Sequence, residues 1–185
     1  MSRVRAIETQ YKGYRMRSRL EARWAVFLDS AGIKWLYENE SLEVQLARGQ
    51  RSMWWLPDFE LPELEQYVEV KGFLSKEEAA RLLLLASGVS DCSEGKDVVV
   101  LGQVHEPNGA RWATQLHFHR GLWAMPWDLM TGCPLLLNRP RMELKGSVST
   151  DLLLGGVPAA PPIWAREPLI AARSARFEHG QYGAG

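Results

Sequence analysis

The stretch that decides the fold is Val68-Glu69-Val70-Lys71-Gly72, in which apolar and charged residues alternate up to a glycine. Successive side chains of a β-strand point to opposite faces of the sheet. The two valines therefore share one face, where a helix can cover them, while Glu69 and Lys71 share the other. The stretch predicts a strand with a buried apolar face and with a carboxylate beside an ammonium on the opposite face.

The preceding segment supplies a second carboxylate. Pro57 and Asp58 lie within an expected strand over Met53–Leu61. A turn over Pro62–Gln66 separates it from the strand over Tyr67–Lys71. Because proline has no N–H to donate to a sheet ladder, the first strand is expected to be irregular, or to lie at an edge, near Pro57. If the two strands pair as a hairpin, the Asp58 carboxylate comes close to the second strand.

This pairing would place Asp58 beside Glu69, and two carboxylates that close repel each other unless a proton or a cation lies between them. Mg²⁺ suits this position, because it prefers hard oxygen ligands and keeps waters that substrate phosphates can replace. The backbone carbonyl of Val70 is a further candidate ligand. Lys71 can orient or help deprotonate an attacking water, or stabilise charge on a phosphate. These residues predict metal-assisted hydrolysis of a phosphodiester.

A helix is expected from about Tyr14 to Ala31. Apolar residues recur along it at spacings of three and four, and Gly32 follows at the place of a left-handed C-cap. Glu21 lies beside the apolar stripe, so it is a candidate third carboxylate that reaches from the helix to the sheet. The arginines around it are Arg15, Arg17 and Arg19. They either bind DNA phosphates or form a solvated helix face, and the sequence leaves both interpretations open.

The remaining pattern predicts an α/β or α+β fold, with a mixed central sheet flanked by helices. Short strands are expected on both sides of a capped helix, and a continuous apolar run predicts one fully buried strand. The expected elements are strands over Ile33–Tyr37 and Leu42–Leu46, a turn over Arg48–Ser52, a helix from Ser75 to about Ala86, a buried strand over Asp97–Val104, and a short strand over Leu116–His119 or Leu122–Met125.

The composition changes near Pro126, where prolines and glycines become frequent. We expect one domain over residues 1–125 and a Pro/Gly-rich extension over residues 126–185. One short helix is expected in this extension, near Pro168–Phe177. The extension is either a tail that wraps the domain or an arm that binds a protein partner.

The 185 residues include 46% hydrophobic and 24% charged residues, which predicts a globular domain and argues against a disordered chain. Basic residues prevail over residues 1–24 and acidic ones over residues 36–69. This separation suits a protein that attracts a polyanion and holds divalent cations, or it marks two solvated faces. Since no apolar run nears the roughly 20 residues of a membrane span, no secretory signal is evident and Cys92 and Cys133 suggest free thiols, we expect a cytoplasmic protein without membrane contact.

Other residues with possible chemistry are expected to be structural. His117 and His119 share a face of an extended strand, but no third ligand stands at a zinc spacing, so zinc is not expected. Trp54 and Trp55 can stack on unpaired bases, but tryptophan more often packs in a core, and we expect that role here. Glu60 is expected to face solvent.

Taken together, these motifs resemble the PD-(D/E)XK nuclease superfamily. The similarity is to small endonucleases of phages, mobile elements and actinobacteria, to the nuclease subunit of heteromeric bacterial transposases, and to phage junction-resolving endonucleases. It extends over about Tyr11–Gly102. The segments that carry it are, in order, Arg17–Ala25, Tyr37-Glu38, Leu56–Phe59 and Val68–Gly72.

The resemblance implies a restriction-endonuclease-like fold and Mg²⁺-dependent cleavage of DNA, with Mn²⁺ able to replace Mg²⁺. It implies that Asp58 and Glu69 are metal ligands, that Lys71 is the catalytic lysine and that Glu21 is an additional helix carboxylate. Double-strand cleavage is then expected to need a homodimer or two successive nicks. Two other functions stay open: a DNA-binding module that has lost turnover, and a structural or adaptor protein of a phage or mobile element that docks through its C-terminal region.

Overall fold

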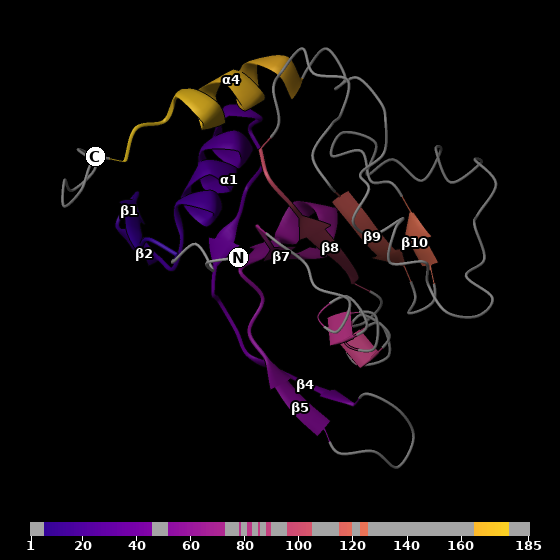
Figure 1. Cartoon of the computed structure of the whole chain (residues 1–185). Coiled ribbons are helices and arrows are strands. Elements are labelled where there is room, and N and C mark those ends of the chain that lie inside the picture. Colours follow the sequence, from indigo (N-terminus) through magenta and orange to yellow (C-terminus); the bar gives the residue numbers. More distant parts are fainter. Residues whose placement is uncertain are drawn as a thin grey trace.

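The computed structural model describes residues 6–45, 52–72, 96–104, 115–119, 123–125 and 165–177, together with residues 78, 81, 82, 85, 88 and 89. A mixed sheet lies at the centre, in the spatial order β10-β9-β8-β7-β6-β3 (Figure 1). Its strands are β3 (Leu36–Tyr37), β6 (Phe59–Leu61), β7 (Gln66–Val70), β8 (Asp97–Leu101), β9 (Gln115–His119) and β10 (Trp123–Met125). Within this sheet β7 and β8 run parallel, and the other neighbours run antiparallel. The protein therefore has the mixed α+β architecture that the sequence predicted.

Two helices belong to one large hydrophobic core with the sheet. α1 (Arg19–Ser30) and α4 (Arg166–Ser174) pack against each other, although they lie near opposite ends of the chain (Figure 1). Val68 and Val70 of β7 are buried in the same core as these helices. The prediction that the valines of this strand face a covering helix is therefore confirmed.

The opposite face of the sheet is buried as well. Val98 and Val100 alternate along β8 with Val99, and all three are buried. Residues 78, 81, 82, 85, 88 and 89 are helical, and Figure 1 draws this segment (magenta) on the side of the sheet away from α1. The helix that the sequence predicted in this region is thus present, while its expected cap, Ser75, lies outside the described residues.

The first helix begins later than predicted. Instead of a helix from Tyr14, the chain forms a hairpin of β1 (Thr9–Tyr11) and β2 (Tyr14–Met16) before α1. The reason is local: Ser18 caps the helix, because its Oγ accepts the Glu21 N–H at 3.1 Å. Met16 is buried as a strand residue, so its helical spacing from the later apolar residues was misleading. The predicted C-cap glycine, Gly32, does adopt a left-handed conformation, with φ +69°.

The strand expected over Met53–Leu61 divides in two at Pro57. β5 (Ser52–Trp55) pairs with β4 (Leu42–Gln45) in a separate hairpin, whereas β6 joins the main sheet. The break follows from the missing N–H of the proline, as predicted. Most of the turn expected between β4 and β5, from Arg48 to Arg51, lies outside the described residues. The next turn is formed by a 3₁₀ helix, η1 (Pro62–Leu64).

The C-terminal part of the chain contributes to the core through α4. This helix lies in the region where the sequence predicted one, and its residues Leu169 and Ala172 are fully buried in the main core. Both strands that the sequence offered as alternatives, β9 and β10, are formed and pair with each other. Residues 126–164 lie outside the described part, so the division of the chain at residue 125 stays a prediction. Among the described residues, no helix is long and apolar enough to cross a membrane.

Candidate active site

The pairing of β6 with β7 brings the two predicted carboxylates together. Phe59 lies opposite Val68, so one further step of the same register places Asp58 opposite Glu69. Asp58 is 4% exposed and Glu69 is 8% exposed. The Val70 N–H donates to Asp58 Oδ2 at 2.6 Å, which fixes this carboxylate against the end of β7. The hairpin that the sequence suggested is therefore present, and it buries both acids at one site.

Glu69 is held by two side chains. Its Oε1 lies 2.6 Å from Lys71 Nζ, and its Oε2 accepts the indole N–H of Trp55 at 3.1 Å. The backbone of Lys71 is fixed in turn, because its N–H donates to Leu101 O on β8 at 2.8 Å. The carboxylate and the ammonium thus lie side by side on one face, as the alternation of β7 predicted.

Glu21 reaches the site from α1. This carboxylate is only 6% exposed, and it accepts the Tyr37 hydroxyl at 2.7 Å. The same oxygen accepts the Arg17 N–H at 3.0 Å, and the other oxygen accepts the Ser18 hydroxyl at 2.7 Å. Because Tyr37 belongs to β3, the interaction joins the helix to the sheet. Both oxygens have partners within the chain, and the charge of Glu21 is near enough to act on Asp58.

The three arginines predicted to bind DNA are in different surroundings. Arg17 Nη2 lies 2.9 Å from Asp58 Oδ1 and also pairs with Glu38. Arg15 pairs with Glu8 at an exposed position, whereas the buried Nε of Arg19 has no hydrogen-bond partner. Of the three, only Arg17 contacts the buried acids.

The charges at the site do not balance. Among the described residues, the carboxylates linked here by hydrogen bonds, ion pairs or close charges are Glu21, Glu38, Asp58 and Glu69, and the cations paired with them are Arg17 and Lys71. Four negative charges against two positive ones leave an excess of two in this described set when every group is ionised. Such an excess in a buried position is costly unless a proton or a further cation reduces it.

The pKa of Asp58 reflects this excess of negative charge. Burial is the main cause that raises the pKa of Asp58, to about 7, and the neighbouring charges of Glu69 and Glu21 raise it further. The Val70 N–H and the Lys71 ammonium act in the opposite direction. A cation bound at Asp58 would offset this repulsion and stabilise the ionised carboxylate.

Lys71 remains an ammonium under ordinary conditions. Burial lowers the pKa of Lys71, but the charges of Glu69, Asp58 and Glu78 outweigh it, so the net shift is upward. A lysine that holds its proton this firmly is suited to stabilising negative charge and to orienting a water molecule. It is less suited to removing a proton from that water.

The side chains alone do not complete the coordination of a divalent metal ion, so a backbone carbonyl, waters or phosphate oxygens must supply the remaining ligands. Among the described residues, no group of three His, Cys, Asp or Glu side chains converges as a self-contained metal site. Asp58 and Glu69 provide two carboxylates, and the Val70 carbonyl is the third candidate ligand from the chain. Mg²⁺ accepts such partial sets, because it retains waters and binds phosphate oxygens. The side chains of His117 and His119 lie outside the described residues, so the expectation of no zinc there stays a prediction.

Several residues of the site were not singled out by the sequence. Tyr37 and Glu38 lay in the wider motif without a role, and Trp55 was expected to be a core residue. Trp55 is buried, as expected, and it also donates to Glu69, whereas the same expectation was wrong for Trp54, which is 69% exposed. Glu60 is only partly exposed rather than solvent-facing, because it pairs with Lys96 at 2.8 Å.

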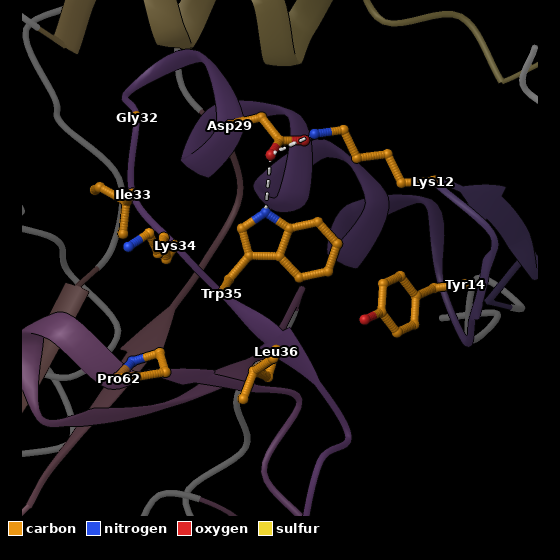
Figure 2. Close-up of a pocket in the computed structure, with 9 residues that line it drawn as sticks. All are labelled: Lys12, Tyr14, Asp29, Gly32, Ile33, Lys34, Trp35, Leu36 and Pro62. Atoms are coloured by element: carbon orange, nitrogen blue, oxygen red, sulfur yellow. Dashed lines mark hydrogen bonds and ion pairs between the residues drawn. The ribbon is translucent and has the colours of Figure 1, made fainter. Parts of the chain in front are cut away.

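An open pocket of about 510 Å³ lies apart from these carboxylates. Figure 2 shows Trp35 in it, with its indole N–H donating to Asp29 at 3.1 Å, and Lys12 ion-paired to the same carboxylate at 2.9 Å. Lys34 and Tyr14 also line it. Asp29 is neutralised within the pocket, and none of the candidate catalytic residues lines it.

Comparisons with known proteins identify no relative. No protein-family model matches the chain, and no curated protein or solved structure matches it. The function is therefore inferred from the geometry and charges of the site itself.

Proposed function

We propose that this protein is a metal-dependent DNA endonuclease, with Mg²⁺ as its cofactor and Mn²⁺ as a substitute. The observation that carries the proposal is the buried pair formed by Asp58, immediately before β6, and Glu69 of the adjacent β7, with Lys71 ion-paired to Glu69. The excess of negative charge around this pair favours a divalent cation. The resemblance to PD-(D/E)XK nucleases, of phage and mobile-element type, supports the same interpretation.

The proposal extends to the fold. The order of α1, β3, β6, β7, a helical segment and β8, with a parallel pair formed across that segment, is compatible with a restriction-endonuclease-like domain. This order places Asp58, immediately before β6, next to Glu69 of β7, and α1 shares a hydrophobic core with both strands. We propose that the domain is of this type and that it acts in the cytoplasm.

Each residue has a defined task in the proposed reaction. Asp58 and Glu69 would hold the metal, together with the Val70 carbonyl, and the metal would polarise the phosphodiester and activate water when bound. Lys71 directs its ammonium toward the developing negative charge and orients the water. Tyr37 fixes the position of Glu21, whose charge favours the binding of a cation at Asp58. Trp55 holds one oxygen of Glu69 in place.

DNA would approach over the exposed Arg17, whose guanidinium can bind phosphates. Arg15 and Arg19 are further candidates for phosphate contacts, as the basic N-terminal segment suggested. Because the proposed site cleaves one strand at a time, a double-strand break requires a homodimer or two successive nicks. A protein partner bound through the C-terminal region remains part of the proposal.

A second function has a specific observation in its favour. Arg17 and Lys71 already form ion pairs with Asp58 and Glu69, so the acids have countercharges without a metal. A DNA-binding module without turnover, or an adaptor of a phage, would need only these two ion pairs to balance the acids and would not need a metal ion. The excess of negative charge that remains makes the nuclease the better supported of the two.

The decisive experiment is cleavage of supercoiled plasmid and of a synthetic four-way junction with Mg²⁺, Mn²⁺ or EDTA. Asp58→Asn, Glu69→Gln and Lys71→Ala are each expected to abolish cutting. The matched control is Glu60→Gln, which removes an acid of β6 that lies two residues after Asp58 and pairs with Lys96 rather than with the site. It should cut at the wild-type rate.

The outcomes separate the two functions. Metal-dependent cutting by wild type and by Glu60→Gln, lost in the three site variants, supports the endonuclease. Metal-independent DNA binding without cutting of either substrate supports the binding module instead. Cutting that survives in Asp58→Asn contradicts the assignment of the site.

A further inference from the structure

Arg17 occupies the oxygen of Asp58 that a metal ion would need. Asp58 Oδ2 already accepts the Val70 N–H at 2.6 Å within the sheet. Oδ1 is the other oxygen, and Arg17 Nη2 donates to it at 2.9 Å. A cation that binds Oδ1 therefore competes with the guanidinium for the same oxygen and is repelled by its charge.

The Arg17 side chain is able to leave this position, whereas its backbone is anchored. The side chain is 56% exposed, so the guanidinium itself can exchange the carboxylate for water or another anion, whereas the buried Asp58 needs an incoming cation to replace it. The Arg17 N–H donates to Glu21 Oε2 and to Tyr37 Oη, each at 3.0 Å. The guanidinium can thus change its position while the Arg17 backbone stays in place, so it remains near Asp58.

We propose that Arg17 exchanges partners when substrate binds, moving from Asp58 Oδ1 to a DNA phosphate as a metal ion takes its place at the carboxylate. This inference rests on the proposed function and deepens it. The guanidinium presents a planar fork of N–H donors that matches the oxygens of a phosphate. In the structure, the Arg17 guanidinium also forms an ion pair with Glu38.

The exchange couples the two ligands of the site. DNA draws Arg17 away from Asp58 and thereby opens Oδ1, while a metal at Oδ1 displaces Arg17 toward DNA. Each ligand therefore strengthens the binding of the other by the same factor, as linkage requires. Without DNA, the guanidinium neutralises Asp58 and keeps the affinity for metal low.

The test compares the full-length wild type with Arg17→Gln and with Lys34→Gln. Lys34 gives a matched loss of one positive charge, because its side chain is 78% exposed and pairs with Glu63 instead of a site residue. Ca²⁺ is the probe, since it also takes oxygen ligands. Its affinity is measured by calorimetry without DNA. The affinity for a fluorescent DNA duplex is measured by anisotropy with and without Ca²⁺, and a gel verifies that the DNA is uncut.

Without DNA, Arg17→Gln should bind Ca²⁺ about tenfold more tightly than wild type, and Lys34→Gln should match wild type. Ca²⁺ should strengthen DNA binding in every variant, because the metal itself can bind a phosphate oxygen, but the gain in Arg17→Gln should be about tenfold smaller than in wild type and in Lys34→Gln. An arginine that stays on Asp58 can change either affinity but cannot add to their coupling. The same gain from Ca²⁺ in Arg17→Gln as in wild type would therefore overturn the exchange, while leaving the nuclease proposal intact.

Two more variants keep the possible failures apart. If Asp58→Asn binds Ca²⁺ as tightly as wild type, the metal does not use Asp58, and both the exchange and the proposed function are overturned. If thermal unfolding shows that Arg17→Gln is not folded, Arg17→Lys takes its place. It keeps the charge but lacks the guanidinium fork, so we expect a weaker coupling than in wild type, and an unchanged coupling would again overturn the exchange.

Discussion

The buried carboxylate of Asp58 predicts a specific dependence of stability on pH in the metal-free protein. Its pKa rises from 3.8 in the unfolded chain to about 7 in the folded one. Between these two values the folded state holds a proton that the unfolded state has lost. The free energy of unfolding therefore falls as the pH rises through this range.

The size of the effect follows from the same two values. At 1.36 kcal/mol per pH unit, the full range corresponds to about 4 kcal/mol. Between pH 5 and pH 8 the expected loss is about 3 kcal/mol, because part of the range lies below pH 5 and none of it above about pH 7. Asp58→Asn has no proton to lose, so this loss should be absent from the variant.

The assay is urea unfolding in EDTA at pH 5, 6, 7 and 8, followed by tryptophan fluorescence. Other titrating groups contribute to both proteins and cancel when Asp58→Asn is compared with wild type. Glu60→Gln, which lacks a different acid of β6, should keep the wild-type dependence. Parallel pH profiles for wild type and Asp58→Asn would refute the reasoning, since they would mean that Asp58 is ionised in the folded protein throughout this range.

Three more predictions concern the site and its support. Mg²⁺ at 100 times its dissociation constant should raise the free energy of unfolding of wild type at pH 8 by about 2.7 kcal/mol and leave Asp58→Asn unchanged; equal thermal shifts in the two proteins would contradict the metal site. Tyr37→Phe removes the hydroxyl that donates to the buried Glu21 and should cost about 1–3 kcal/mol in urea unfolding; a cost near zero would mean that water replaces the hydroxyl. Gly88→Ala places a Cβ 2.3 Å from the carbonyl oxygen of Gln45 and should cost about 1–3 kcal/mol, so an unchanged melting temperature would speak against this close packing of helix and hairpin.

The strand alternation was the most informative feature of the sequence. In β7 it separates Val68 and Val70, which enter the core, from Glu69, which enters the site. The position of Glu21 beside an apolar stripe likewise anticipated a buried carboxylate. Both inferences rely on local periodicity, which the amino-acid sequence contains in full.

The partners of these residues could not be predicted in the same way. Tyr37 meets Glu21 through the packing of β3 against α1, and Trp55 meets Glu69 because Pro57 redirects the chain between two strands. Such contacts depend on tertiary geometry, which the spacing along the chain does not encode. The predicted start of α1 was wrong for a local reason. Ser18 caps the helix, although the apolar repeat extends further toward the N-terminus, to Met16.

The packing of α4 on α1 affects the stage of synthesis at which the chain can complete its fold. α1 carries Glu21, yet part of its core is completed by Leu169 and Ala172 of α4, which are synthesised long after α1. Domains begin to fold from the N-terminus during translation, but contacts of such long range form late. A nascent chain therefore carries all the proposed catalytic residues before it has the helix that supports them. Full assembly of the site is expected only after α4 has emerged from the ribosome, which would keep an unfinished chain from acting on DNA.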